Sequence, residues 1–346
     1  MLLMRNAARS IGIFLAILAT PLALLAVTTP VSNVGLAYVI GSAIVIVGML
    51  TAPKRVSRMK GVVRAGLGLI ALTVLFRLAF AGHGKTITMI CGQGGTPLLD
   101  RLLPESDVAT TSARAVIIAG VLPSNDTKSL VPTLRASFLR MDEEEGSTPS
   151  PIVRTMLKLQ TKATYDVIEI PAALPHATDA VLFLHGYGGN FTLQCWAIAK
   201  ASKLANATTF CPSTRLSGDW WQADGPAIVT DMLAKLRARG FERIVLAGLS
   251  NGGIGASRLT ASYKKNIVGL LLVSGADPDA EPSGVPTIAF QGSRDGMMPP
   301  SHVRSYAEKT GATYVELDGT HFLLLEKLDE MTNAMGEWLL QRFTAR

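Results

Sequence analysis

Acidic residues are missing from the first 99 positions of this 346-residue chain, and Asp100 is the first of them. Of the 33 Lys and Arg residues, nine lie within residues 1–85, which leaves 24 for the remainder against all 26 acidic residues. The formal net charge of +7 therefore belongs to the N-terminal segment, and the rest of the chain is close to neutral. Because the positive charge has this origin, it does not support a nucleic-acid partner, and we expect none.

Cysteine and histidine are scarce as well. At least one of the three cysteines is unpaired, and Cys195 and Cys211 could pair only if the ends of their elements meet, so we expect buried free thiols. His83 and His176 show no metal-ligand spacing, and neither a phosphate-binding loop nor a dinucleotide fingerprint is present. The sequence therefore predicts no metal site and no cofactor.

Long apolar runs fill the N-terminal segment instead. Residues 11–28 and 34–51 carry no charge, and each matches the ~17–25 residues of a membrane-spanning helix. A third run, residues 65–82, is apolar except for Arg77, which lies near its end and could reach the interface. No signal-peptide cleavage site closes the first run, so we expect a membrane anchor over residues 1–82 with two or three transmembrane helices. An interfacial or buried helix is the alternative for the third run.

Basic residues predict how this anchor is oriented. Arg5 and Arg9 precede the first run, five more Lys and Arg residues lie between the second and third, and the turn 29–33 has none. The positive-inside rule then places the N-terminus in the cytoplasm. Three spans would put the rest of the chain on the extracytoplasmic (periplasmic) side, whereas two would leave it in the cytoplasm.

Residues 83–165 are less informative and are expected to be a linker and N-terminal extension. Short strands are predicted at 86–90 and 115–118, and a helix at 130–141. The acidic, Pro- and Ser-rich stretch 142–151 predicts a linker or exposed loop. The predicted strands could extend a following sheet as an antiparallel edge, and we find no chemistry in this region.

Residues 166–346 alternate between short apolar runs and helical stretches. This alternation predicts an α/β domain with a mostly parallel, doubly wound sheet, and ligands bind beyond the carboxyl ends of such strands. The expected strands lie near 166–170, 180–184, 207–211, 243–248, 268–274, 286–291 and 313–317, and the expected helices near 191–204, 223–239, 251–263, 301–310 and 324–343.

Residues 248–252, Gly-Leu-Ser-Asn-Gly, form the most informative motif. They follow an apolar run and precede a helix of small residues. A serine between two glycines at a strand-to-helix turn is the form of a nucleophile elbow. Strained backbone there projects the hydroxyl above the sheet, and larger side chains in place of the glycines would collide with neighbouring elements. Ser250 is therefore the predicted nucleophile.

Three further loops follow predicted strands. Residues 185–189 form a glycine-rich turn, and the amides of Tyr187 and Asn251 are the predicted oxyanion donors. Asp295 follows one strand as the predicted acid, and His321 follows the last strand as the predicted base. Ser250, Asp295 and His321 stand in the chain order Ser…Asp…His.

Other residues compete for these roles. His302 lies seven residues after Asp295 at the start of a predicted helix, but the chain order favours a loop histidine after the last strand. Asp277 and Asp279 follow the preceding strand, and Asp318 is better explained as a turn former before Gly319.

With these motifs, the chain from about Asp166 to Phe343 resembles the α/β-hydrolase fold in its esterase- and lipase-like branch. The matching pieces are the turn after His185, the Ser250 elbow, the loop 292–295 and the loop 319–322. The resemblance implies a Ser-His-Asp hydrolase, but it says little about substrate, because many chemistries share this scaffold.

The substrate is constrained mainly by loop lengths. The 45 residues from Ser250 to Asp295 leave no room for a large cap domain, so any lid must come from residues 212–222 or 83–165. Gly186, Trp220 and Trp221 are the predicted substrate contacts, although a core or rim position suits the tryptophans equally. A compact, open site suggests esters with small or medium acyl groups. A peptidase or thioesterase, or a non-catalytic membrane-tethered binding module, are the alternatives, and the complete triad argues against the last.

Overall fold

The computed structural model describes residues 10–17, 20, 29, 31–50, 56–82, 84–92 and 98–344. The chain divides into two compact units, which we call the helical unit (Met1–Gly82 with Arg101–Ala119) and the sheet unit (His83–Asp100 with Gly120–Arg346). The helical unit contains α2 (Asn33–Leu50), α3 (Val56–Phe80) and α5 (Glu105–Ile118), and α4 (Leu99–Leu102) falls at the division.

An eight-stranded sheet forms the centre of the sheet unit, with strand order β1-β2-β4-β3-β5-β6-β7-β8. The strands are β1 (Thr88–Cys91), β2 (Asp166–Ile170), β3 (Asp179–Leu184), β4 (Thr208–Pro212), β5 (Arg243–Leu249), β6 (Gly269–Val273), β7 (Thr287–Gly292) and β8 (Thr313–Leu317). The pairs β1–β2 and β2–β4 are antiparallel, and every later pair is parallel. The central strands are apolar on both faces because helices cover both sides of a parallel sheet.

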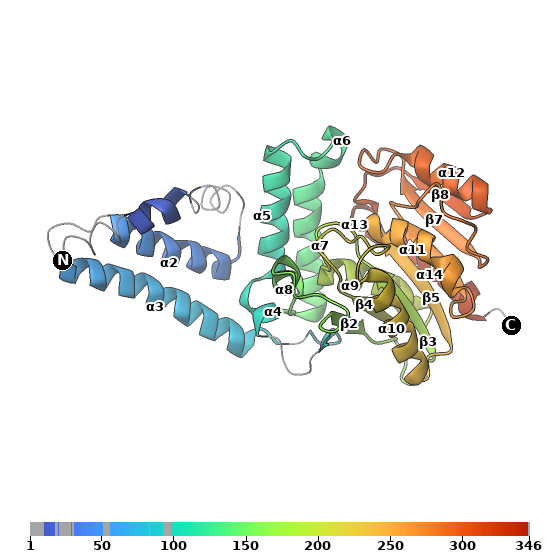
Figure 1. Ribbon diagram of the computed structural model, residues 1–346, viewed down its shortest axis with the longest axis horizontal. Coiled ribbons are helices and arrows are strands. Elements are labelled where there is room, and N and C mark those ends of the chain that lie inside the picture. The colour runs from blue at the N-terminus through green and yellow to red at the C-terminus, as the bar shows by residue number, and fades with distance from the viewer. Residues whose placement is uncertain are drawn as a thin grey trace. The chain divides into compact units, whose positions relative to one another are not determined.

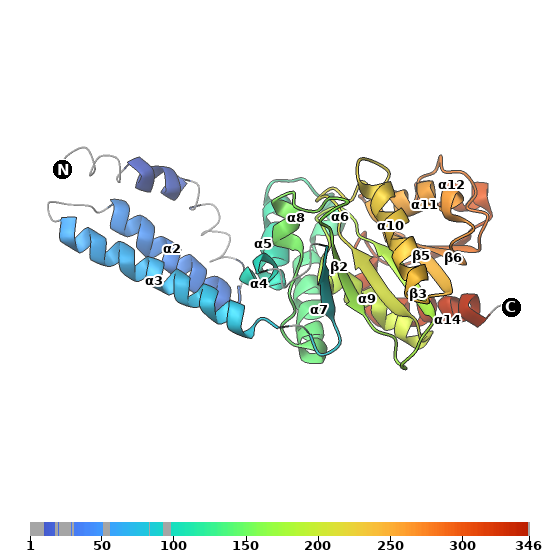
Figure 2. The ribbon, with the colours of Figure 1, turned by 60° about the horizontal axis from the view of Figure 1, so that its bottom comes forward.

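Two helical layers cover this sheet (Figures 1 and 2). One layer holds α10 (Gly225–Ala238), α11 (Asn251–Tyr263) and α12 (Pro300–Thr310), and the other holds α9 (Thr192–Leu204) and α14 (Leu328–Thr344). Apolar side chains of the first layer join one core with alternate residues of the strands. Gly336 of α14 packs closely on Leu204 of α9 in the second layer. The remaining helices of this unit are α6 (Ser124–Thr127), α7 (Leu130–Glu145), α8 (Ile152–Met156) and α13 (Leu323–Glu326).

The predicted α/β class and mostly parallel sheet are confirmed, and each strand predicted after residue 165 lies within two residues of an observed one. Two predictions before it are wrong. Residues 115–118 end helix α5 instead of forming a strand, and residues 142–145 are the last turn of helix α7 instead of a linker. A short apolar run does not distinguish strand from helix, and glutamate, which fills positions 143–145, is a good helix former.

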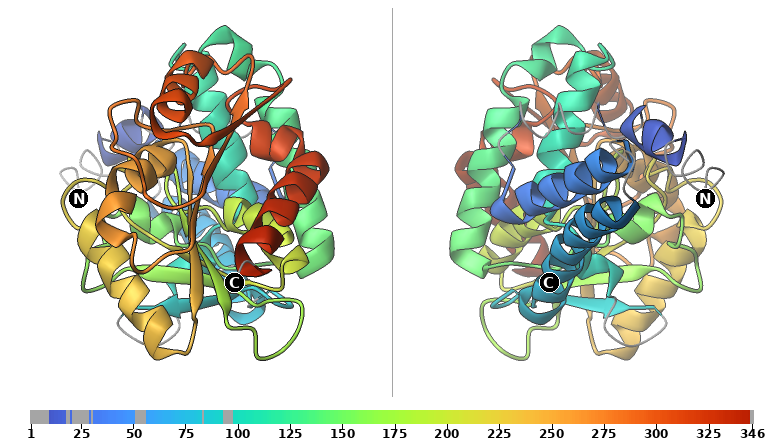
Figure 3. Two further views of the ribbon diagram at one scale, coloured as in Figure 1. Left: turned by 90° about the vertical axis from the view of Figure 1, so that its right-hand side faces the viewer. Right: turned by 90° about the vertical axis from the view of Figure 1, so that its left-hand side faces the viewer.

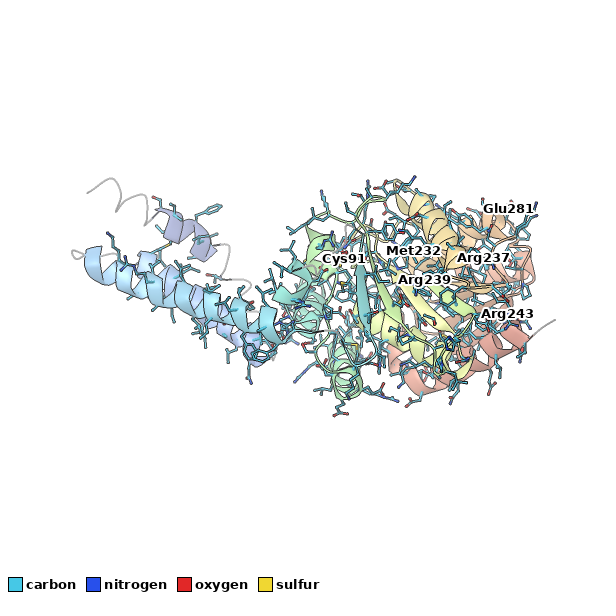
Figure 4. All side chains as sticks on the ribbon, turned by 90° about the horizontal axis from the view of Figure 1, so that it is seen from below. Cys91, Met232, Arg237, Arg239, Arg243 and Glu281 are labelled. Carbon is cyan, nitrogen blue, oxygen red and sulfur yellow. A yellow bond between two sulfur atoms is a disulfide. The ribbon has the colours of Figure 1, made fainter. Side chains whose placement is uncertain are left out.

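The disulfide between Cys195 of α9 and Cys211 of β4 corrects another expectation. We expected free thiols because these residues lie on different elements. Packing of α9 on the sheet brings the two cysteines together, and their Cα atoms are 6.1 Å apart. Cys91 on β1, labelled in Figure 4, has a free thiol.

The helical unit contains two helices that are long and apolar enough to cross a membrane, Asn33–Leu50 and Lys60–Phe80. The right-hand view of Figure 3 shows α2 and α3, in blue, crossing closely. A Cβ on Gly41 would lie 2.7 Å from Ile70, and one on Gly66 would lie 2.7 Å from Val45, so glycines permit this approach. The first predicted span, 11–28, lies largely outside the described residues, of which 10–17 are helical.

Polar contacts bind α2 and α3 to residues 101–107 of the same unit. The Asp107 carboxylate of α5 accepts the backbone N–H of Ser32 at 2.8 Å and its hydroxyl at 2.6 Å, next to the start of α2. Near the end of α3, the buried Arg77 donates from Nε to the Arg101 carbonyl at 2.9 Å. The start of α2 and the end of α3 therefore lie at the same end of the helical hairpin.

Candidate active site

Ser250 stands at a strained turn between β5 and α11. Its φ of 54° and ψ of −121° are a conformation that residues with a side chain rarely adopt. The flanking glycines are required by space: a Cβ on Gly248 would lie 2.3 Å from the Gly252 carbonyl oxygen, and one on Gly252 would lie 2.0 Å from that of Leu184. The turn thus has the geometry of a nucleophile elbow, with Ser250 projecting at the carboxyl end of β5.

His321 and Asp295 meet at this serine. Nε2 of His321 lies 2.9 Å from the Ser250 hydroxyl oxygen, and Nδ1 lies 2.9 Å from Oδ2 of Asp295 and 3.1 Å from Oδ1. With a carboxylate at Nδ1, that nitrogen carries the proton, so Nε2 accepts the hydroxyl hydrogen bond. All three side chains are buried, and the serine is the most exposed of them at 9%. The structure therefore brings the three predicted residues together in hydrogen-bonding order.

The Asp295 carboxylate is held by its own loop and by β7. Oδ1 accepts the backbone N–H groups of Met297 at 2.9 Å and Met298 at 2.7 Å. Gln291 donates from Nε2 to Oδ2 at 2.8 Å. These bonds satisfy both carboxylate oxygens and fix their orientation toward the imidazole. Gln291 is thus a site residue that the sequence analysis did not single out.

The competing acids and histidine have other partners or lie apart. Asp277 forms an ion pair with Arg258, and Asp318 forms an exposed pair with Arg294 at 2.8 Å. Asp279 is exposed, and so is His302 on α12. None of these four side chains hydrogen-bonds to Ser250, Asp295 or His321, which all belong to the described part of the chain.

The turn after β3 lies against the nucleophile. A Cβ on Gly186 would be 3.0 Å from the Ser250 Cβ, so the backbone that leads to Tyr187 passes beside the serine. His185 is buried, accepts the Thr214 N–H at Nε2 at 3.1 Å and bonds the Gly186 carbonyl through Nδ1 at 2.8 Å. Burial lowers the pKa of His185 to about 4, so this imidazole is neutral near pH 7 and positions the turn.

The loop 212–222 closes the other side of this turn. The Gly188 amide donates to the Leu216 carbonyl at 2.8 Å, and the Asn251 side-chain amide donates to the Ser217 carbonyl at 2.8 Å. Among the described residues, the backbone N–H groups of Tyr187 and Asn251 form no such loop bond. These two amides are therefore available to a group bound beside Ser250.

Trp220 and Trp221 occupy different environments. Trp220 is fully buried, and its indole N–H donates to the His185 carbonyl at 2.9 Å. A side chain in this place cannot contact a substrate, so the expectation for Trp220 gives way to a structural role under the turn. Trp221 is partly exposed and stacks with the guanidinium of Arg258, 4.7 Å from the ring centre.

Two carboxylates at the site were missed by the sequence analysis. Asp126 of α6 accepts the backbone N–H groups of His321 at 2.9 Å and Gly296 at 3.0 Å. Glu326 of α13 accepts the Thr320 N–H at 2.8 Å. Asp126 lies in the region where we expected no chemistry, and no motif surrounds it, because its role depends on a contact across 195 positions.

No protein-family model matches the chain, and no curated protein matches it. Among solved structures it is similar to an α/β serine hydrolase without a lid from Xanthomonas campestris, at 18% identity over 54% of this chain and 94% of that one, with a TM-score of 0.45. It is also similar to Est1E from Butyrivibrio proteoclasticus, at 14% identity over 53% of this chain and 96% of that one, with a TM-score of 0.45. A soluble variant of monoglyceride lipase from Saccharomyces cerevisiae matches at 13% identity over 53% of this chain and 93% of that one, with a TM-score of 0.43.

The sheet of this chain places the nucleophile turn after β5, the acid loop after β7 and the histidine loop after β8, all at the carboxyl ends of parallel strands. The antiparallel strands β1 and β2 lie at one edge, and the order β4-β3-β5 brings the oxyanion turn beside the nucleophile. By this strand order and these loop positions, the sheet unit has the α/β-hydrolase fold.

Proposed function

We propose that this protein is a membrane-anchored serine hydrolase that cleaves carboxylic esters through Ser250, His321 and Asp295. The observation that carries the proposal is the hydrogen-bonded series from the Ser250 hydroxyl through the His321 imidazole to the Asp295 carboxylate, built on a strained turn. Strain and buried polar groups are costly to maintain, and they concentrate at functional sites. A binding module without catalysis would not need this geometry.

The reaction follows from these positions. His321 takes the proton from the Ser250 hydroxyl through Nε2 as the oxygen attacks the ester carbonyl carbon. The amides of Tyr187 and Asn251 stabilise the tetrahedral oxyanion, each contributing about 3–4 kcal/mol. His321 then protonates the leaving alcohol, which gives an acyl-enzyme on Ser250. Water activated by the same imidazole releases the acid and restores the serine.

Exposed apolar side chains lie on the loops that follow β3, β4 and β7, and they favour an acyl group as the bound part of the substrate. Tyr187 and Leu216 come from the two loops that meet beside Ser250, and Met297 follows Asp295. Trp221, partly exposed, is the remaining candidate among the predicted contacts. Apolar contacts of this kind bind acyl chains of small or medium length. Peptides and thioesters are the alternative substrates for the same residues.

For the location, we propose that residues 1–82 anchor the chain and that the sheet unit is extracytoplasmic. Ser32, just before α2, and Arg77, near the end of α3, both contact residues 101–107, whereas the basic residues 54–64 stand in the sequence between the second and third apolar runs. The positive-inside rule then favours the cytoplasm for that connection and the outside for the end of α3. The Cys195–Cys211 disulfide supports the same side, because disulfides persist in oxidising compartments.

The decisive experiment uses the detergent-solubilised full chain. A serine-directed phosphonate should label the wild-type protein at Ser250, and Ser250→Ala should abolish labelling and lower kcat for ester hydrolysis by about 10⁴-fold or more. Thermal melting of the variant should match that of the wild type. An unlabelled, well-folded wild type would overturn the hydrolase proposal.

A panel of substrates separates the alternatives. Chromogenic esters, thioesters and aminoacyl amides with the same acyl group should be compared by kcat/KM, and we expect the esters to be preferred. A higher kcat/KM for the amides would indicate a peptidase. A higher kcat/KM for the thioesters would indicate a thioesterase.

A reporter fusion tests the location separately. A reporter that is active only outside the cytoplasm should be active when fused after residue 85. An inactive reporter there, together with an active one at the turn 29–33, would show that the sheet unit faces the cytoplasm.

A further inference from the structure

Asp126 is a fully buried carboxylate supplied to the candidate active site by the short helix α6, which lies outside the sheet. Oδ1 accepts the His321 N–H at 2.9 Å, and Oδ2 accepts the Gly296 N–H at 3.0 Å. The two oxygens thus bind the backbones of two separate loops, one that carries the candidate base and one that carries the candidate acid.

The contact with the acid loop is close. A Cβ on Gly296 would lie 2.7 Å from the Pro123 Cβ and 2.8 Å from Oδ2 of Asp126. Gly296 directly follows Asp295 in the chain, so the position of the Gly296 amide constrains the position of the Asp295 side chain. A side chain at 296 would displace this loop from Asp126.

A second bond ties the same segment to the histidine loop. The Ser129 hydroxyl donates to Oε1 of Glu326 at 2.5 Å, and Glu326 also accepts the Thr320 N–H and hydroxyl at 2.8 and 2.9 Å. Residues 123–129 therefore hold the histidine loop at two adjacent residues, directly at His321 and through Glu326 at Thr320.

The charge environment of Asp126 is unusual for a structural carboxylate. Burial raises the pKa of Asp126, and the nearby Asp295 carboxylate raises it further, whereas the hydrogen bonds from the His321 and Gly296 amides lower it. Two members of the candidate triad, Asp295 and His321, are thus among the groups that act on Asp126. A buried carboxylate is costly unless hydrogen bonds compensate it, so the two backbone bonds to Asp126 are needed to keep it in place.

We infer that Asp126 is a positioning residue of the Ser250–His321–Asp295 arrangement, and that its carboxylate sets the distance between the acid loop and the histidine loop. It touches no reacting atom, and it acts through the backbones of residues 296 and 321. The inference rests on the proposed hydrolase function. Misplacing a catalytic group by about 1 Å can cost 10²-fold in rate, so release of either loop should be visible in kcat.

The test compares Asp126→Asn and Asp126→Ala in the full chain with the exposed Glu281→Gln, labelled in Figure 4, as the charge control. Asn keeps one acceptor oxygen and Ala keeps none. We expect kcat to fall about 10-fold for Asn and about 100-fold for Ala, with KM changed less than about threefold. The rate of phosphonate labelling should fall in the same order, and Glu281→Gln should match the wild type. Lower melting temperatures with unchanged kcat would overturn the inference by assigning Asp126 a structural role alone.

Hydrogen exchange of the wild type keeps the inference testable if both variants fail to fold. Peptides that contain Gly296 and His321 should each hold one strongly protected amide, because each donates to a buried carboxylate. Rapid exchange at both amides would overturn the inference. Failure of the wild type to react with the phosphonate would overturn the proposed function instead, which separates the two outcomes.

Discussion

The two ends of the parallel strands differ in their polar residues: ion pairs occur at both ends, and the carboxyl ends also hold buried carboxylates that bind loop backbones. At the amino ends, arginines pair with carboxylates: Arg243 binds Asp179 through two bonds of 2.7 and 3.0 Å, and Arg239 binds Glu169 through bonds of 2.9 and 2.7 Å. Figure 4 labels Arg237, Arg239 and Arg243, which stand where α10 ends and β5 begins. These arginine side chains are partly exposed, so solvent screens their pairs.

At the carboxyl ends, buried carboxylates bind loop backbones, and two serines have strained backbone conformations. Asp126 and Asp295 accept backbone N–H groups, and Ser250 and Ser274 have φ values of 54° and 49°. The amino ends thus hold the fold together, whereas the carboxyl ends fix loops in place at an energetic cost. Stability is thus associated with the amino edge, and the proposed chemistry with the carboxyl edge.

The largest expected effect is at His321. His321→Ala removes the group that accepts the Ser250 proton, so kcat should fall about 10³–10⁶-fold, nearly as far as in Ser250→Ala. His302→Ala is the matched control, because that imidazole is exposed on α12 and should leave kcat within about twofold. Steady-state hydrolysis of one chromogenic ester measures both variants. A severe loss in His302→Ala with a mild one in His321→Ala would reverse the assignment of the base.

The next largest effect on kcat is expected for Gly186→Ala. In Gly186→Ala the new Cβ would lie 2.9 Å from the Leu249 carbonyl oxygen and 3.0 Å from the Ser250 Cβ, so the oxyanion turn must move away from the nucleophile. We expect kcat to fall about 10–100-fold while the protein still folds.

The control for Gly186→Ala is Gly311→Ala. Gly311 precedes β8 and therefore lies near the amino ends of the parallel strands. Gly311 has a φ of 73° with open space around it, so its substitution should cost about 1 kcal/mol of stability through backbone strain without changing kcat. Equal losses of kcat in the two variants would mean that activity reports general stability, not the geometry of the carboxyl edge.

The sequence predicts the carboxyl edge well where the signal is local. Ser250 is recognisable because the Gly-Leu-Ser-Asn-Gly motif is contiguous in the chain, and the strands before each loop are continuous apolar runs. The Cys195–Cys211 pair, Asp126 and Gln291 could not be identified in this way. Each depends on which elements pack together in space, and the spacing of residues along the chain does not predict that packing. The burial of Trp220 is of the same kind, because its place is set by the His185 carbonyl.

The region 83–165 shows why local patterns failed there. Residues 115–118 are an apolar run that suits a strand, but the preceding turns of α5 extend the helix through them. Acidic residues 142–145 suit an exposed loop by charge, yet Glu144 binds Trp196 and Lys200 from the helix, and Glu145 binds the backbone of Thr86. The preceding turns of the helix decide the first case and tertiary partners decide the second, and composition does not reveal either.

Asp100 predicts a pH-dependent effect on stability. It is buried near Asp166, where β2 begins, and its carboxyl oxygens have no hydrogen-bond partner among the described residues. Burial, and then the charge of Asp166, raise the pKa of Asp100 to about 8, so the group is protonated in the folded protein near pH 7 and ionised in the unfolded chain. A raised pKa contributes stability at low pH that is lost as the pH rises through the folded value.

Asp100→Asn should remove this loss of stability at high pH. The gain in free energy of unfolding over the wild type should be small at pH 4 and grow to about 2–4 kcal/mol at pH 8. Denaturant melts of both proteins at the two pH values measure it, with the exposed Glu281→Gln as control. A gain of the same size at both pH values would contradict a buried, protonated Asp100.

The smallest effect is expected at the amino edge, in Arg239→Gln. Arg239 pairs with Glu169 while its guanidinium lies 4.9 Å from the centre of the Phe210 ring, and 44% of its side chain is exposed. Because solvent screens the pair, its loss should lower the free energy of unfolding by about 1 kcal/mol at most, and added salt should reduce the difference. The kcat should stay within about twofold, since Arg239 precedes β5 whereas Ser250 follows it. A drop of 10-fold or more in kcat at an unchanged melting temperature would break the division between the two edges, because it would connect an amino-end ion pair directly to the chemistry at Ser250.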